Sequence, residues 1–135
     1  MKISNTCSYA ITAVTLIASQ PANSHVSNAR ICKVANMPER YVLQVLRTLV
    51  NEQILLSVRG VHGGYRLARL ASRITLLEIV EAIDGPIGAA EPVAIQGMAK
   101  ASVNAVGKAL TGVAEDTRMR LAAITLTDLR AAKAA

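Results

Sequence analysis

Apolar residues recur every three or four positions over the first fifty residues, which is the spacing that places them on one face of a helix. The first such stripe, within residues 4–19, consists of Ala10, Ala13, Val14 and Ile17. A second stripe follows Ser27, a residue type that caps helix N-termini, and stops at Asn36. Its inward positions are expected to be Ile31, Val34 and Ala35. The pattern thus predicts two helices in succession.

A third stripe, from Pro38 to about Gln53, is the most amphipathic of the three. Proline suits the first turn of a helix, because the N–H that it lacks has no intrahelical partner there. One face is apolar and comprises Val42, Val45, Leu46 and Leu49. The opposite face carries polar and basic residues, with Leu43 at its border: Arg40, Tyr41, Gln44, Arg47 and Thr48. No acidic residue lies between Arg40 and Val50, so this face is rich in hydrogen-bond donors.

The next pattern is that of a β-hairpin, in the stretch SVRGVHGGYRLAR from Ser57 to Arg69. Residues 54–58 and 65–68 are typical of strands, and three glycines lie between them: Gly60, Gly63 and Gly64. Glycine allows a tight turn with positive φ, which we expect at the tip. Arg59 and His62 would make this tip basic.

The C-terminal half begins with a capping box, Thr75 followed by Glu78, which predicts a helix to Ile83 that closes at Asp84-Gly85-Pro86. Residues 85–97 are rich in Gly, Ala and Pro, as in a linker. Beyond them a helical seam is formed by Val103, Val106, Leu110, Val113 and Leu121. Gly107 and Gly112 each weaken an isolated helix by about 1 kcal/mol relative to Ala. Such a helix depends on tertiary or intersubunit packing. We favour a dimerisation helix, because the N-terminal domain already has enough apolar faces to close on itself; the alternative is a helix folded back on its own core.

Composition and charge narrow the class of protein. The 135 residues fit one domain with an appendage, and the core must be aliphatic because Trp and Phe are absent. Residues 1–73 hold nine Lys or Arg and two acids, a net charge of +7, whereas the remainder is −1. The basic half is where a polyanion would bind. No apolar run is long enough to span a membrane and no signal-peptide core is evident, so we expect a cytoplasmic protein.

Three helices followed by a hairpin predict a winged helix-turn-helix: a mainly α fold with a small β-hairpin wing and a long C-terminal dimerisation helix. The expected parts are a DNA-binding domain (1–86), a linker or sensor-type loop (87–97), and the dimerisation helix with a C-terminal segment (98–135). The helix at about 38–53 would enter the major groove, with the wing at 54–68 beside the minor groove. The expected DNA contacts are Ser27, Asn28, Arg40, Tyr41, Gln44, Arg47, Thr48, Arg59, His62, Gly63, Gly64 and Tyr65.

The run PERYVLQVLRTLVNEQILLSVRGVHGGYRLAR with ITLLEIVEAIDGP resembles the Rrf2 superfamily of bacterial winged-helix transcription regulators. The opening MKISNTCSYAITAV and the segment ITLTDL, residues 124–129, are also similar to that family. The resemblance implies a homodimeric regulator, most simply a repressor, on a palindrome-like operator of double-stranded DNA. Tyr41 and Gln44 match the family's recognition-helix positions, and Arg59 matches its wing arginine. Many members have Gly-Pro-Gly-Gly-Gly-Tyr where this chain has residues 60–65.

The sensor departs further from the family. Members that hold an iron–sulfur cluster use three cysteines between the capping-box helix and the dimerisation helix, as thiolates are the usual ligands of such iron. This chain has only Cys7 and Cys32, so we expect neither a family-type cluster nor another cofactor or metal site. A small molecule or a partner protein would then be the effector. An enzyme is not indicated, because phosphate-loop, HExxH and GxSxG motifs are missing. The alternatives are a protein-binding winged-helix module and a thiol- or metal-responsive regulator.

Overall fold

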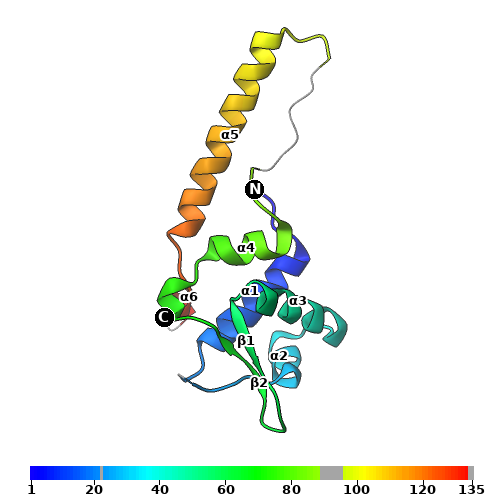
Figure 1. Cartoon of the computed structure of the whole chain (residues 1–135), viewed down its shortest axis with the longest axis vertical. Helices are drawn as coiled ribbons and strands as arrows, with labels where there is room; N and C mark the ends of the chain where they lie inside the picture. The colour runs from blue at the N-terminus through cyan, green and yellow to red at the C-terminus, as the bar shows by residue number, and fades with distance from the viewer. Residues whose placement is uncertain (22, 89–95, 134–135) are drawn as a thin grey trace.

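The computed structural model describes residues 1–21, 23–88 and 96–133, and its elements follow the predicted order (Figure 1). It is mainly helical with one two-stranded antiparallel sheet. The elements are α1 (Asn5–Ala18), α2 (Asn28–Ala35), α3 (Glu39–Asn51), β1 (Leu55–Val58), β2 (Gly64–Leu67), the 3₁₀ helix η1 (Ala71–Arg73), α4 (Leu76–Asp84), α5 (Lys100–Ala122) and α6 (Leu126–Lys133).

Local capping sets the bounds of the first three helices. The Ser4 hydroxyl accepts from the Cys7 N–H at the start of α1, and the Ser27 hydroxyl accepts from the Arg30 N–H at the start of α2. Asn36 ends α2 in the left-handed conformation, at φ +51°, which asparagine tolerates better than most residues. Pro38 is the N-cap of α3, one position before the helical turn in which we expected it.

The inward face of α2 differs from the prediction at one position. Ile31 is fully buried, and Cys32 and Ala35 pack against the core, but the Val34 side chain is 58% exposed. The stripe of α2 therefore passes through Cys32 where we expected Val34. A helix of eight residues has only two turns, so a small rotation of its axis decides which of two neighbouring positions faces inward.

The core joins all the N-terminal elements through aliphatic side chains, as expected of a chain without Trp or Phe. It contains the apolar stripes of α1 and α3 together with Val26, Ile54, Leu55, Ile74 and Ile79. The four apolar positions predicted for α3 are all buried. This packing fixes α3 with its polar face outward.

The C-terminal α6 returns to this core instead of extending α5. Leu126 is fully buried, and the 124–126 segment pairs with residues 74–76 through the Leu76 N–H to Ile124 C=O bond (2.8 Å) and the Leu126 N–H to Ile74 C=O bond (3.0 Å). The two segments read ITL in both places. Asp128 accepts from the Thr125 N–H at 2.9 Å, just as Glu78 accepts from the Thr75 N–H at 2.9 Å. The C-terminal segment is thereby part of the same core as α1.

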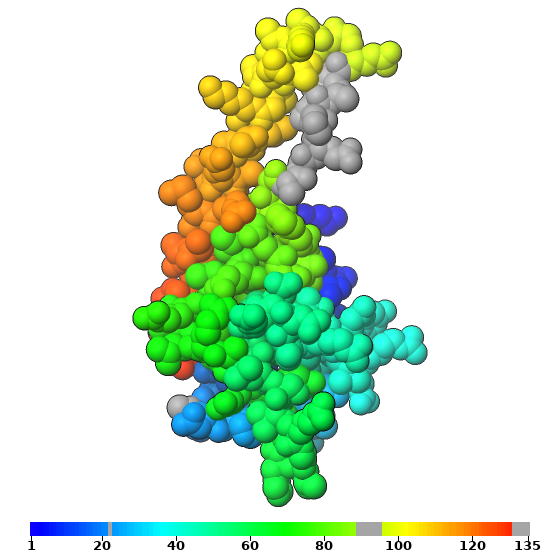
Figure 2. Space-filling view, viewed as in Figure 1, coloured from blue at the N-terminus to red at the C-terminus, as the bar shows by residue number. Residues whose placement is uncertain are grey.

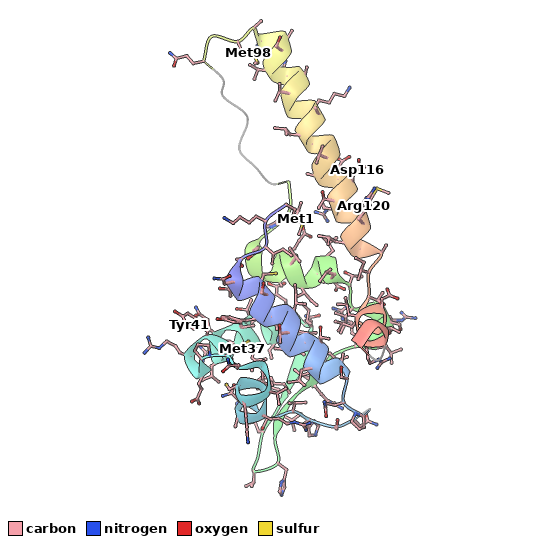
Figure 3. The ribbon with its side chains drawn as sticks, turned by 180° about the vertical axis from the view of Figure 1, so that it is seen from behind. Met1, Met37, Tyr41, Met98, Asp116 and Arg120 are labelled. Atoms are coloured by element: carbon pink, nitrogen blue, oxygen red, sulfur yellow. The ribbon has the colours of Figure 1, made fainter. Side chains whose placement is uncertain are left out.

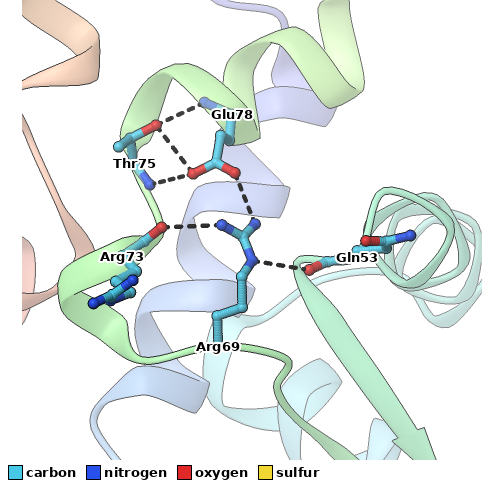
Figure 4. A network of polar contacts seen from close by, with 5 residues as sticks. All are labelled: Gln53, Arg69, Arg73, Thr75 and Glu78. Atoms are coloured by element: carbon cyan, nitrogen blue, oxygen red, sulfur yellow. Dashed lines mark hydrogen bonds and ion pairs between the residues drawn. The ribbon is translucent and has the colours of Figure 1, made fainter.

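An arginine joins the end of the hairpin to α4 (Figure 4). Arg69 donates to Glu78 Oε1 at 2.7 Å, to the Arg73 carbonyl at 3.0 Å and to the Gln53 carbonyl at 3.4 Å. Burial by itself would raise the pKa of Glu78, but the hydrogen bonds from Arg69 and Thr75 and the Arg69 charge together hold that pKa below its ordinary value. The same carboxylate completes the predicted capping box of α4.

The long α5 stands away from the rest of the molecule, and only its C-terminal end returns to α4 (Figures 1 and 2). Arg118 forms an ion pair with Glu81 of α4 at 3.1 Å. None of its residues, all of which the structure describes, is buried. At the opposite end of the molecule the wing hairpin also protrudes (Figure 2).

Candidate nucleic-acid interface

The outer face of α3 carries the polar side chains predicted for DNA contact. Arg40, Tyr41, Gln44 and Arg47 are exposed, and Figure 3 shows Tyr41 at the outer surface of this helix. Thr48 is half-buried, and its hydroxyl donates to the Gln44 carbonyl at 3.1 Å. Four side chains on this face are thus free to reach a ligand, whereas the donor of Thr48 is already in use.

The wing tip presents two side chains that were predicted to contact DNA and one exposed side chain, Val61, that the sequence analysis did not single out. Arg59 and His62 are exposed. Val61 is 98% exposed, which makes it the most accessible of the large hydrophobic side chains in the described residues. The exposure of Val61 could have been predicted from its position between Gly60 and Gly63, because a residue between two turn glycines lies at the tip of a hairpin.

The wing glycines have different structural roles from those we expected. Positive φ occurs at Gly60 (+114°) and Gly64 (+156°), but Gly63 has no positive φ. A Cβ atom on Gly63 would lie 2.1 Å from the Val58 carbonyl oxygen, and one on Gly64 would lie 2.4 Å from the Val26 carbonyl oxygen. Gly63 is therefore required by close backbone approach, and its expected positive φ was wrong.

The wing root is tied to the start of α2. The Val26 N–H donates to the Tyr65 carbonyl at 2.9 Å, and the Tyr65 N–H donates to the Val26 carbonyl at 2.8 Å. Tyr65 is half-buried and packs against the core, and Ser27 follows directly as the N-cap of α2. The Val26–Tyr65 pairing therefore ties the wing to the start of α2, and the predicted contacts Gly63, Gly64 and Asn28 are half-buried.

No ion pair among the described residues neutralises the positive charge of this surface. In the part of the chain that the structure describes, the two ion pairs are Arg69–Glu78 and Arg118–Glu81. Neither includes an arginine of α3 or Arg59. The arginines of α3 and Arg59 of the wing are therefore available to an anionic partner.

A second candidate surface is the predicted seam of α5. Leu110 and Val113 are 54% and 63% exposed, whereas Val103, Val106 and Leu121 are half-buried. Leu121 lies in the last turns of α5, near the ion pair that attaches the helix to α4. The seam is consequently most open over its central part, where no described element of the same chain covers Leu110 and Val113.

The two cysteines are separate and differ in environment. Burial, with the nearby Asp84 carboxylate, raises the pKa of the Cys7 thiol to about 11. Burial, followed by the charge of Glu39, also raises the pKa of Cys32, which is only partly buried on α2. Both thiols are neutral at physiological pH, and across residues 1–21, 23–88 and 96–133 no three His, Cys, Asp or Glu residues group as metal ligands. Glu91 of the sensor-type loop lies outside the described residues.

Comparison with known proteins places this geometry in a family. The Rrf2 family, described as iron-dependent transcriptional regulators, matches residues 3–132. The regulator CymR of Bacillus subtilis is 32% identical over 91 residues, which are 67% of this chain and 66% of CymR. An IscR regulator of Cereibacter sphaeroides is 34% identical over 91 residues, which are 66% of this chain and 59% of IscR. Rv1287 of Mycobacterium tuberculosis is 25% identical over 95 residues, and the match spans 59% of its length.

Solved structures agree with the sequence comparison. The structure of CymR, named in that work the global cysteine regulator of B. subtilis, superposes with a TM-score of 0.79 over 97% of both chains at 26% identity. T. potens IscR gives a TM-score of 0.65 at 26% identity, over 96% of this chain and 85% of IscR. The mainly helical fold with a small wing and a long C-terminal helix, predicted from the sequence, is thereby confirmed. Within the described residues, no helix has both the length and the apolar character that a membrane span requires. The chain belongs to the Rrf2 family of helix-turn-helix transcriptional regulators.

Proposed function

We propose that the protein is a repressor that binds a palindrome-like operator as a homodimer. In this proposal α3 enters the major groove, Gln44 and Tyr41 contact base edges, and Arg40 and Arg47 contact phosphates. Arg59 and the wing tip lie at the adjacent minor groove. Gln44 suits adenine, because its amide N–H can donate to adenine N7 while its amide oxygen accepts from the adenine N6 amino group in a bidentate contact.

The observation that carries the proposal is the combination of an exposed, acid-free face on α3 with a wing tethered to α2. The Val26–Tyr65 hydrogen bonds fix the wing relative to the helix-turn-helix. A rigid arrangement limits the conformational entropy that is lost on binding. A protein-binding module would instead favour an apolar or mixed surface on α3, whereas the exposed side chains of this face are mainly polar and basic.

The homodimer is supported by the uncovered seam of α5. Leu110 and Val113 lie three residues apart on a 23-residue helix that projects from the core. A second copy of the same helix offers an identical stripe, and a two-fold axis between the copies brings two recognition helices onto two half-sites. Half-sites about 10 base pairs apart, or a multiple of this spacing, would fit that symmetry.

We further propose that regulation does not use the family's iron–sulfur cluster. The family description implies iron, but the donor set of this chain does not fit it. Its only cysteines are Cys7, a buried residue of α1, and Cys32 on α2, and the described residues offer no cluster of ligands. Anaerobically purified protein should be colourless. Stoichiometric iron with visible absorbance would contradict this proposal.

The experiment that tests operator binding is selection of DNA fragments by the purified full chain, followed by sequencing. The recovered fragments should share an inverted repeat, and affinity should fall by about 10³-fold or more between 50 and 200 mM salt if the dimer neutralises six to ten phosphates. Transcription in vitro from a promoter that overlaps the repeat should decrease when the protein is added. Unenriched fragments, or an affinity that salt does not change, would overturn the proposal.

A matched pair of variants separates specific charge contacts from general basicity. Arg47→Gln removes a charge from the exposed face of α3, and Arg120→Gln removes one from the exposed surface of α5. Only the α3 variant should weaken binding substantially. Equal weakening by both would indicate an unspecific attraction of the basic chain to DNA.

A further inference from the structure

A pocket of about 280 Å³ lies at the wing root, on residues separate from those predicted to contact DNA. It is formed where the end of α1 and the loop that follows meet β2, η1 and α6. Three arginines line the pocket: Arg66 of β2, Arg69 of the segment between β2 and η1, and Arg130 of α6. No acidic side chain is among its lining residues, all of which the structure describes.

The three arginines differ in how far the chain already uses them. Arg69 is paired with Glu78 at 2.7 Å, as Figure 4 shows. Arg130 Nη1 donates to the Ala18 carbonyl at 3.2 Å, at the C-terminal end of α1. Arg66 Nε is buried, but it has no hydrogen-bond partner in the described chain. A buried N–H of a charged group without a partner is unfavourable, so the described chain leaves the Arg66 guanidinium incompletely hydrogen-bonded.

We propose that this pocket binds a small organic anion, with a carboxylate that accepts hydrogen bonds from Arg66. The planar guanidinium presents parallel N–H donors that match the two oxygens of a carboxylate. Arg130 adds a second positive charge, and its hydrogen bond to the Ala18 carbonyl satisfies an acceptor that would otherwise repel an anion. Ile17, Leu67 and Leu70 supply an apolar wall for a short carbon body. A volume of about 280 Å³ is at the lower end for ligand pockets, which favours a molecule of few heavy atoms.

The position of the pocket connects it to the DNA-reading elements. Arg66 directly follows Tyr65, whose backbone pairs with Val26 at the start of α2. Ser24, which lines the pocket, is two residues before Val26. An anion held between Arg66 and this loop therefore contacts the segment that orients α2 relative to the wing. A regulatory effect on operator affinity rests on the proposed function, whereas binding of the anion does not.

The test uses succinate and, separately, inorganic phosphate as probes on the full chain without DNA, at constant ionic strength. Isothermal titration and thermal melting are recorded for the wild type, for Arg66→Gln, and for Arg59→Gln as a matched loss of charge outside the pocket. Succinate should bind saturably, with binding weakened at least about tenfold by Arg66→Gln and left within about twofold by Arg59→Gln. Phosphate should bind more weakly than succinate, because it makes no use of the apolar wall.

Several results would overturn the inference. These are the absence of saturable succinate binding, equal affinity for succinate and phosphate, and equal succinate affinity in wild type and Arg66→Gln. Should Arg66→Gln not fold, Arg66→Lys retains the charge without the guanidinium fork, and an unchanged succinate affinity in that variant would count against the proposal. If Arg66→Gln instead weakens DNA binding while the wild type binds no succinate, Arg66 contacts phosphate of the nucleic acid. Because the titration contains no DNA, its result is independent of the operator experiment.

Discussion

Leu46 of α3 and Leu110 of α5 are the same side chain on two amphipathic helices, yet their surroundings are opposite. Leu46 is fully buried among the N-terminal elements, whereas Leu110 is 54% exposed. The N-terminal region, with α6 returned to it, covers its apolar stripes within one chain. The α5 region leaves part of its apolar stripe exposed, although its apolar residues recur with similar spacing.

The difference shows that a hydrophobic stripe specifies a contact without specifying the partner. In α3 the contact is supplied by α1, α2 and the hairpin, which are close in sequence. In α5 the ion pair to α4 lies at the C-terminal end of the helix, and no described element covers Leu110 and Val113, which the proposed second copy would cover. The two regions should therefore respond differently to the same kind of substitution.

The largest expected effect is on the closed core. Leu46→Ala should lower the free energy of unfolding by about 2–5 kcal/mol, through lost burial and the cavity left behind. Leu110→Ala is the matched control. Its effect on the free energy of unfolding should be smaller and should depend on protein concentration, because Leu110 is covered only in the proposed dimer. Urea unfolding at two protein concentrations distinguishes these cases. A large, concentration-independent loss in Leu110→Ala would mean that the seam is covered within one chain.

The next effect concerns the open seam itself. Val113→Asp places a charge in the proposed dimer interface and should produce a monomer, with operator affinity about 100-fold weaker, equivalent to about 2.8 kcal/mol. Met119→Asp, on the same helix but outside the seam and 71% exposed, should remain a dimer. Light scattering and operator titration provide the measurements. A monomeric wild type, or a dimeric Val113→Asp, would contradict the assignment of the seam.

The exposed polar face of α3 should determine which bases the protein prefers. Gln44→Ala should weaken binding to the cognate operator by about 1–3 kcal/mol and relax discrimination at one base pair in each half-site. Its thermal stability should not change, because the side chain is exposed. Affinities measured on single-base operator variants test this. Uniform weakening across all of these variants would indicate that Gln44 contacts the backbone instead of a base.

The wing should contribute less, and through groove shape. Arg59→Ala should weaken binding about five- to tenfold, about 1 kcal/mol, on operators with A·T-rich flanks, whose narrow minor groove has the most negative potential. On G·C-rich flanks the loss should be smaller. Identical losses on both flanks would assign Arg59 to a simple phosphate contact, and unchanged affinity on both would remove the wing from the interface.

The smallest effect is the acid dependence of the Arg69–Glu78 contact. Since the folded-state pKa of Glu78 is lowered, this carboxylate stabilises the fold above its unfolded pKa and loses that contribution as the pH falls through the folded value. Its ionised form is partly solvated, which limits the gain. Glu78→Gln should therefore flatten the loss of melting temperature below about pH 4.5, while Glu115→Gln on exposed α5 should not. Equal acid profiles for wild type and Glu78→Gln would refute this contribution.

The sequence by itself determined the features that depend on neighbours a few residues apart. The apolar stripes of α1 and α3, the caps at Ser27 and Thr75, and the two-stranded wing all follow from short-range periodicity and local hydrogen bonding. The acid-free face of α3 was also evident from the sequence, because the helical period places its members together. The DNA contacts, and the division of the chain into residues 1–86, 87–97 and 98–135, remain predictions.

Only the tertiary structure decided the features that join segments far apart in the chain. The burial of Leu126 depends on pairing between residues 124–126 and 74–76, and the exposure of Val34 depends on how α2 rests on the core. The pocket likewise brings Arg66 and Arg130 together across 64 positions of sequence. Periodicity carries no information about such contacts, since the free energy that selects them comes from packing and backbone pairing among whole elements.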